Sequence, residues 1–250
     1  MFNHSLRRGI NTLVPYVPLI LSLTVKMDTR FVHPFRGQIC GGSSSGKTYF
    51  THKFLRNVQK LVTTAPDYIL WFYGEIQPIY EEILKTVPNI QFIEGFPSNF
   101  ESLLNPTKAG MIIIDDLLQE LASDDRLSKL FTKTSHHKNV SILFLTQNLF
   151  YGGSNRVMRT VSLNTEYFLL MKNPRDASQI TNLAKQMYPG NVHFLQESYR
   201  DATKEPYSYL LIDLKMTTPD HLRLRTRIFP GERQVVYVPK QMKISTLGFI

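Results

Sequence analysis

Residues 37 to 50 read GQICGGSSSGKTYF, and the fold can be worked out from this stretch outward. From Gly41 to Thr48 it fits the pattern G-x-x-x-x-G-K-S/T, between an apolar strand expected over 37–40 and a helix expected over 47–62. Glycines let a backbone curl around a phosphate, so that N–H groups and the helix start face the anion. The stretch predicts a nucleotide-binding loop, and a plain Gly/Ser turn is the alternative.

The positions of this loop predict which groups bind the ligand. Lys47 is expected to reach the β- and γ-phosphates, and the hydroxyl of Thr48 is expected to bind a metal ion. The cofactors predicted from this pattern are ATP and Mg²⁺. The residues expected to contact the nucleotide are Gly41, Gly42, Ser43, Ser44, Ser45, Gly46, Lys47 and Thr48.

Outward from the loop, β-rich runs alternate with helical stretches, which is typical of parallel strands joined by crossover helices. Several strands are apolar throughout, as expected of central strands covered on both faces. The predicted fold is therefore α/β, a mostly parallel sheet with helices on both faces. Further strands are expected over 68–73, 90–94, 111–114, 140–146, 167–171 and 209–214, and further helices over 78–86, 99–104, 117–134 and 176–187.

Polar side chains follow two of these apolar strands. The string MIIIDD ends in Asp115, expected to hold Mg²⁺, and Asp116, expected to polarise the attacking water. The strand over 140–146 is followed by Gln147, expected to sense the γ-phosphate or to orient water. Each also fits a simpler reading, since polar residues commonly leave strands and an aspartate commonly caps a helix.

The formal net charge of +9 is concentrated at the two ends of the chain. Residues 37–214 carry 17 basic and 17 acidic side chains, so the excess lies in residues 1–36 and 215–250. A neutral body with basic ends suits a polyanion, although basic termini can simply be solvated.

The string HLRLRTRIF, residues 221–229, lies in the basic C-terminal part. It alternates apolar residues with Arg223, Arg225 and Arg227. As a strand it would present all three on one face, either toward DNA phosphates or as a charged edge that prevents aggregation.

Composition bounds the remaining possibilities. With 250 residues, 42% apolar and 20% charged, the chain is typical of a globular protein. Cys40 is the one cysteine, which excludes a cysteine-rich zinc site and favours a reducing intracellular setting. His136 and His137 have no acidic or cysteine neighbours, so we expect a helix end or a loop near the nucleotide rather than a metal site.

Three segments are expected along the chain: a poorly ordered extension over 1–30, a nucleotide-binding domain over 31–240 and a tail over 241–250. The apolar run within the extension contains Pro15 and Pro18 and falls short of the ~20 residues that span a bilayer. No stable membrane anchor is therefore expected.

Longer strings resemble a known family. The order of the GKT loop, the Asp pair and the glutamine resembles the FtsK/HerA division of P-loop ATPases, of the RecA/ASCE type. Within that division the chain is similar to viral genome-packaging ATPases, above all that of Polinton (Maverick) elements and adintoviruses. The resemblance covers about residues 31–240. It rests on the strings WFYGEIQPIY, MIIIDDLLQE, LFTKTSHHKNVSILFLTQNLF, RTVSLNTEYFLLMKNPRD and LAKQMYP.

The resemblance implies a homo-oligomeric ring that hydrolyses ATP to drive double-stranded DNA into a capsid. Its implied partners are double-stranded DNA and the capsid proteins of the element. The implied location is inside the host cell, in the nucleus or at a viral assembly site. Many relatives have Glu after the metal-binding Asp, and Asp116 is one methylene shorter.

A ring motor also requires a positive finger from the neighbouring subunit. The candidates are Arg159, expected in a Gly-rich loop, and Arg175 in KNPRD, and each also fits a surface or helix-capping arginine. Two other functions stay open. The chain can be a P-loop enzyme that acts on a small nucleotide, or a non-catalytic relic of an integrated element. The intact Lys47, Thr48 and Asp115 speak against decay.

Overall fold

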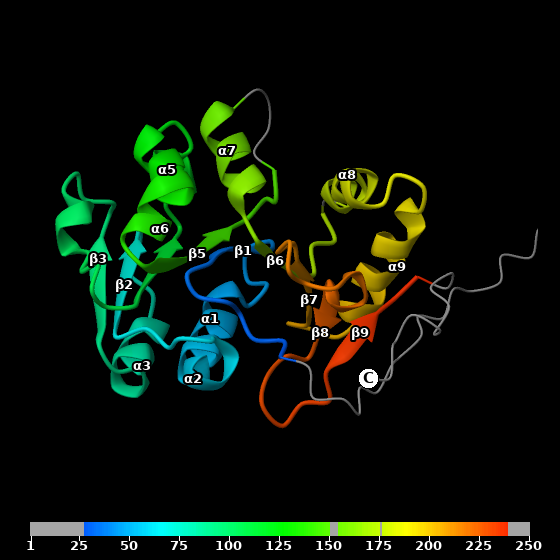
Figure 1. The fold of residues 1–250 in the computed structure, drawn as a ribbon, viewed down its shortest axis with the longest axis horizontal. Helices are drawn as coiled ribbons and strands as arrows, with labels where there is room; N and C mark the ends of the chain where they lie inside the picture. The colour runs from blue at the N-terminus through cyan, green and yellow to red at the C-terminus, as the bar shows by residue number, and fades with distance from the viewer. Residues whose placement is uncertain (1–27, 151–154, 176, 240–250) are drawn as a thin grey trace, which may run out of the picture.

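The structure is a computed structural model that describes residues 28–150, 155–175 and 177–239, in which one nine-stranded sheet forms the centre (Figure 1). The strands are β1 (Arg36–Cys40), β2 (Tyr68–Tyr73), β3 (Ile90–Glu94), β4 (Gly110–Asp115), β5 (Val140–Thr146), β6 (Tyr167–Met171), β7 (Tyr209–Asp213), β8 (Leu224–Thr226) and β9 (Val235–Tyr237). Their order across the sheet is β3-β2-β4-β5-β1-β6-β7-β8-β9. The first six in this order run parallel, and β7, β8 and β9 add antiparallel pairs.

Helices cover both faces of the sheet (Figure 1). One face carries α1 (Lys47–Arg56), α2 (Val58–Leu61) and α3 (Ile79–Thr86). A short 3-10 helix, η3 (Asp220–Leu222), lies between β7 and β8. The opposite face carries η1 (Phe100–Leu103), α4 (Leu118–Leu121), α5 (Asp125–Lys129), the π-helical turn η2 (Leu130–Thr134), α6 (Ser135–His137), α7 (Arg156–Asn164), α8 (Ser178–Met187) and α9 (Val192–Ala202).

The apolar strands supply both layers of the core because successive side chains point to opposite faces. In β2, Ile69 and Trp71 pack on the α1 side, whereas Leu70 and Phe72 pack on the other side. A strand buried on both faces needs apolar residues at every position, which explains runs such as YILWFY. The predicted α/β class, with a mostly parallel sheet and helices on both faces, is confirmed.

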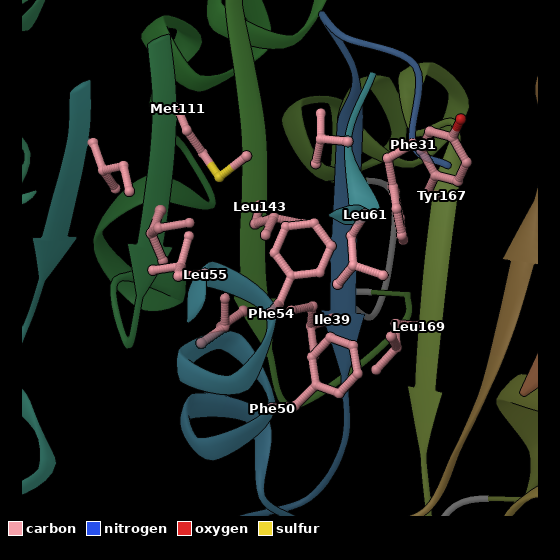
Figure 2. Packing of buried hydrophobic residues seen from close by; sticks show 14 of the residues in the cluster. Phe31, Ile39, Phe50, Phe54, Leu55, Leu61, Met111, Leu143, Tyr167 and Leu169 are labelled. Carbon is pink, nitrogen blue, oxygen red and sulfur yellow. The ribbon is translucent and has the colours of Figure 1, made fainter. Parts of the chain in front are cut away.

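Helix α1 is anchored to the sheet by aromatic side chains (Figure 2). Phe50 and Phe54 are buried in the same cluster as Ile39 of β1 and Leu143 of β5. Burial of one such side chain stabilises a fold by roughly 1.5–3 kcal/mol. The segment between β1 and α1 is therefore held at both ends.

The seven strands predicted from the sequence agree with the structure to within one residue at each end. The helices agree less well. The helix expected over 47–62 is interrupted at Asn57, and the one expected over 117–134 is broken into α4, α5 and η2. The second break has a local cause, because the Asp124 side chain accepts a hydrogen bond from the backbone of Arg126 and starts a new helix.

The predicted stripe of three arginines is wrong. Strand β8 is three residues long and contains Arg225, which is 1% exposed and donates to the Asp213 carboxylate at 2.8 Å. A buried carboxylate requires a charged or hydrogen-bonding partner, and Arg225 supplies it. Arg223 precedes the strand and donates to Asp220 at 2.8 Å, whereas Arg227 follows it in a left-handed conformation, with φ at 56°.

Five of the seven basic residues in the described parts of the two ends form ion pairs. Arg227 and Arg233 are exposed and make no ion pair with a described carboxylate. The ion pairs are Arg30 with Asp28, Arg36 and Lys215 with Glu166, Arg223 with Asp220, and Arg225 with Asp213. Residues 1–27 and 240–250, which include most of the expected extension and the whole expected tail, lie outside the described residues. Among the described helices, none has the length and apolar character needed to cross a membrane.

Candidate functional site

The loop between β1 and α1 has a tightly curled backbone. Ser44 and Gly46 have left-handed φ angles of 59° and 95°. A Cβ atom on Gly41 would lie 2.5 Å from Ser45 Oγ and 2.8 Å from Met171 Cβ, so this turn requires glycine. The Ser45 hydroxyl is buried and has no hydrogen-bond partner among the described residues. A curled loop with an unsatisfied polar atom fits the predicted phosphate site.

Lys47, the first residue of α1, turns back across this loop. Its Nζ donates to the carbonyl oxygens of Gly41 at 2.8 Å and Gly42 at 3.1 Å. Burial lowers the pKa of Lys47, and the nearby negative charge of Asp115 opposes that shift. The ammonium group therefore lies where the pattern G-x-x-x-x-G-K-S/T predicts a phosphate contact.

Asp115 is the last residue of β4 and is 3% exposed. Its Oδ2 accepts hydrogen bonds from the hydroxyls of Tyr80 at 3.1 Å and Thr48 at 3.4 Å. Burial raises the pKa of Asp115 to about 6, against the lowering effects of the Tyr80 bond and of Lys47. The two predicted metal ligands, Thr48 and Asp115, are thus side by side, and their oxygen donors are of the type that Mg²⁺ prefers.

Asp116, unlike its neighbour Asp115, is exposed to solvent. Its backbone is left-handed, with φ at 57°, a conformation that costs a non-glycine residue on the order of 1 kcal/mol or more. Gly74, directly after β2, makes room for it, because a Cβ at Gly74 would lie 2.5 Å from the Asp116 carbonyl oxygen. The neighbouring carboxylates Asp115 and Asp116 therefore have opposite environments, one buried and one open to solvent.

A pocket of about 890 Å³ brings together the predicted residues from three separate segments. Its volume lies in the range of about 300–1,000 Å³ that is usual for small-molecule sites. Gly41, Gly42 and the two candidate finger arginines do not line it. The lining residues are Ser43, Ser44, Ser45, Gly46, Lys47, Thr48, Tyr49, Gly74, Glu75, Gln77, Asp115, Asp116, Leu118, Gln119, Glu120, Leu145, Thr146, Gln147 and Asn148.

Gln147 is exposed at the carboxyl end of β5, where the following turn is held by hydrogen bonds. Thr146 Oγ1 donates to the Asn148 carbonyl at 2.9 Å, and Gln38 Nε2 donates to Thr146 Oγ1 at 3.0 Å. Gln38 is itself buried in β1. Strand β1, which leads into the curled loop, therefore also supports the turn that carries Gln147.

Gln179 of α8 holds the next residues of this turn. Its side-chain oxygen accepts from the backbone N–H of Leu149 at 2.5 Å and of Phe150 at 3.3 Å, and its amide donates to Asn148 Oδ1 at 3.2 Å. One side chain thus connects α8 to three consecutive residues after Gln147.

The structure adds functional candidates that sequence reasoning missed. Tyr80 and Gln179 lie on helices, where they read as ordinary core or surface residues, and no local pattern indicates their partners. Gly74 has a weak signal, as a glycine directly after an apolar strand. Glu75 and Glu120 place two further carboxylates in the same pocket.

The two candidate finger arginines are both exposed. Arg159 lies on helix α7 rather than in the expected Gly-rich loop, because Asn155 caps a helix that starts at Arg156. Arg175 follows β6, and its backbone N–H donates to the Asn173 side chain at 3.2 Å. The glycines of the expected loop and Asp176 of KNPRD lie outside the described residues.

His136 and His137 are exposed on the short helix α6, in agreement with the expected helix end. Within residues 28–150, 155–175 and 177–239, no three His, Cys, Asp or Glu side chains group as metal ligands. Cys40, the last residue of β1, is buried with its Sγ 3.3 Å from Thr146 Oγ1, and burial raises the pKa of its thiol to about 12.

Comparisons with known proteins give structural likenesses alone. No protein-family model matches the chain. No curated protein matches it. The fold is similar to the genome-packaging NTPase B204 of Sulfolobus turreted icosahedral virus 2, solved with ATP-gammaS, at 14% identity and a TM-score of 0.47 over 82% of this chain and 98% of that one.

Two further solved structures are similar. EssC (ATPases 2 and 3) of Geobacillus thermodenitrificans has 10% identity and a TM-score of 0.45, over 85% of this chain and 42% of that one. The flagellar accessory protein FlaH of Methanocaldococcus jannaschii has 14% identity and a TM-score of 0.38, over 56% and 72%. Likeness at these identities concerns the backbone fold, so the chemistry has to be argued from the pocket.

Proposed function

We propose that the protein is an ATPase. The observation that carries this proposal is the meeting of Lys47, Thr48, Asp115, Asp116 and Gln147 in one pocket beside a curled, glycine-containing loop. Glycine-rich loops at helix starts bind phosphates, and an adjacent buried carboxylate with a threonine hydroxyl is a suitable Mg²⁺ site. When bound, Mg²⁺ neutralises charge on the phosphate oxygens.

The chain's own residues then have distinct tasks in ATP hydrolysis. Lys47 contacts the β- and γ-phosphates, and Thr48 with Asp115 holds the metal ion. The exposed Asp116 accepts a proton from the attacking water, and Gln147 orients that water. Glu75 also lines the pocket, and its carboxylate is a suitable comparison for Asp116.

We further propose that ATP hydrolysis drives double-stranded DNA into a capsid, inside the host cell. The sequence resemblance to packaging ATPases and the basic ends of the chain support this. Arg227 and Arg233 are exposed members of that excess within the described residues. The proposed motor is a homo-oligomeric ring, because a finger arginine from a neighbouring subunit would complete each site. Its further proposed partners are capsid proteins.

Substitutions in the pocket test the ATPase proposal. Lys47→Ala should weaken ATP binding and abolish turnover, because the phosphates lose their positive contact. Asp116→Asn should keep ATP binding but lower turnover by about 10²- to 10⁴-fold, the usual contribution of a general base. Calorimetric titration with ATP and a phosphate-release assay measure the two effects.

Glu75→Gln is the matched control, because it neutralises a carboxylate of the same pocket. It should retain far more turnover than Asp116→Asn. The reverse result would move the role of general base to Glu75. Undiminished turnover in Lys47→Ala would contradict the ATPase site itself.

Turnover with and without double-stranded DNA tests the motor proposal. DNA should accelerate ATP hydrolysis, and the acceleration should decline steeply with salt and depend little on base sequence, because the contacts are to phosphates. A rate of ATP hydrolysis that DNA does not change, together with transfer of the phosphoryl group to a small nucleotide, would favour the small-nucleotide enzyme.

A further inference from the structure

The pocket residues define the direction in which a nucleoside triphosphate would lie, and the following inference rests on the proposed ATPase function. Asp115 is the last residue of β4 and Gln147 directly follows β5, so they place the γ-phosphate end on that side of the loop. Strand β1 lies between β5 and β6 in the sheet. The nucleoside, at the other end of the phosphate chain, would therefore leave the loop on the side of β6 and β7.

An aromatic ring lies on the loop at that side. Tyr207 directly precedes Ser208 and β7, and it approaches Gly46 so closely that a Cβ there would lie 2.9 Å from Tyr207 Cδ1. Gly46 has a φ of 95°, which already favours glycine. The absence of a side chain at Gly46 thus also lets the ring contact the loop backbone.

Tyr207 is unusual because it is exposed. Its exposed fraction is 67%, although large aromatic side chains are normally buried. Among the described residues, the large hydrophobic side chains that lie exposed include just two aromatic ones, Tyr207 and Tyr49. Tyr49 is 64% exposed and lines the pocket in the first turn of α1. Both exposed rings therefore adjoin the phosphate loop.

The turn that presents Tyr207 is well supported. Its backbone is left-handed, with φ at 58°, and the neighbouring Ser208 hydroxyl donates to the Glu205 carbonyl at 2.7 Å. Tyr209, the first residue of β7, packs edge-on against Phe50 of α1, with the ring centroids 4.8 Å apart. Tyr207 is thus held in a fixed place relative to the helix that begins the nucleotide site.

We propose that Tyr207 is the base-stacking residue of the nucleotide site, and that its ring receives the aromatic base of the bound nucleoside triphosphate. An exposed ring in contact with the phosphate loop, on the side opposite to Asp115 and Gln147, can stack on a base while Lys47 holds the phosphates. Stacking of this kind tolerates different bases, because every base has a π-face.

The test compares ligands with and without a base. Calorimetric titration of the full-length chain uses ATP, ADP and inorganic tripolyphosphate, each with Mg²⁺. Tyr207→Asn removes the ring and suits the left-handed backbone, which asparagine tolerates well. It should weaken the binding of ATP and ADP by the same factor, roughly 5- to 100-fold, and leave tripolyphosphate binding within about twofold.

Two variants serve as controls. Tyr207→Phe keeps the ring and should bind ATP like the parent chain. Met216→Asn makes the same replacement at another exposed side chain, beyond the opposite end of β7, and should change nothing. Unchanged ATP affinity in Tyr207→Asn, or an equal loss for ATP and tripolyphosphate, would overturn the stacking role. Failure of the parent chain to bind any of ATP, ADP and tripolyphosphate would instead overturn the proposed ATPase function.

A second measurement covers the case in which Tyr207→Asn does not fold. The chain has one tryptophan, Trp71, which is buried. In Tyr207→Trp, ATP should quench the fluorescence of the new indole and tripolyphosphate should not. The tryptophan fluorescence of the parent chain should change with neither ligand. Equal fluorescence with ATP and without it would contradict the proposal.

Discussion

In the metal-free protein, the burial of Asp115 conflicts with the negative charge that its carboxylate needs to bind a cation. Burial raises its pKa from an ordinary 3.8 to about 6, so the folded chain holds this proton more tightly than the unfolded chain does. Its contribution to the free energy of unfolding is complete below about pH 4 and is lost as the pH rises through about 6. At neutral pH the buried carboxylate therefore destabilises the fold while it is ready to bind a cation.

This conflict predicts that Asp115→Asn stabilises the metal-free protein. The gain in the free energy of unfolding should be roughly 3 kcal/mol at pH 7.5 and about half of that at pH 5, since one pKa unit corresponds to about 1.4 kcal/mol. Urea unfolding in the presence of a chelator measures it at both pH values. A variant less stable than the parent at both would show that the hydrogen bonds from Tyr80 and Thr48 outweigh the cost of the buried charge.

At the scale of elements, helix α8 and strand β1 together hold the turn that carries Gln147. Gln179 bonds the backbone of Leu149 and Phe150 and the side chain of Asn148, and Gln38 supports Thr146 from the other side. This turn is thus held by an element that follows it in the chain after one helix, α7, and one strand, β6. Its position depends on how α8 packs.

This arrangement predicts that Gln179→Leu lowers ATP turnover and spares ATP affinity. The turn would lose three hydrogen bonds, and a displacement of about 1 Å at a catalytic group can reduce a rate by about 10²-fold. Steady-state turnover and calorimetric Kd values separate the two effects. The control is Gln186→Leu, an exposed glutamine on the same helix, which should leave both unchanged. Equal turnover in the two variants would show that α8 does not position Gln147.

At the scale of the whole molecule, the pocket of one chain holds a single described lysine and no described arginine. Arg159 and Arg175 are exposed and do not line it. In the proposed ring, a neighbouring subunit would supply the positive finger that stabilises the transferred phosphoryl group.

Mixing experiments test this expectation. Replacing the finger, Arg159 or Arg175, by alanine should keep ATP binding and lower turnover by about 10³-fold, because the charge acts mainly on the transition state. Mixtures of such subunits with Lys47→Ala subunits should regain activity. A site becomes complete where a subunit with an intact Lys47 lies next to a subunit with an intact finger arginine. Arg156→Ala, a neighbouring exposed arginine on α7, is the control for Arg159. Mixed rings that stay inactive at every ratio would exclude that arginine, and full activity in a monomer would exclude the ring motor.

The local sequence was sufficient for seven of the nine strands and for the central residues of the pocket. The pattern of Gly41 to Thr48 and the uninterrupted apolar strands reflect short-range rules of turn geometry and burial, so the seven strands and the pocket residues Lys47, Asp115 and Gln147 could be placed in advance. The roles of these residues in hydrolysis stay predictions. Helix α7 could not be anticipated, because its Thr, Ser and Val residues favour no single local structure.

Contacts between distant segments depended on the folded topology. Tyr80 is 35 residues from Asp115 in the chain, and Gln179 is 30 from Leu149, so only the packing of α3 and α8 reveals these pairs. The alternating pattern of residues 221–229 suggests that Arg225 lies on the surface. In the structure it is buried and forms an ion pair with the buried carboxylate of Asp213. Local sequence patterns indicate whether a segment prefers a strand, a helix or a turn. The partner of a buried polar group is set by which strands become neighbours in the sheet, and that is a property of the whole chain.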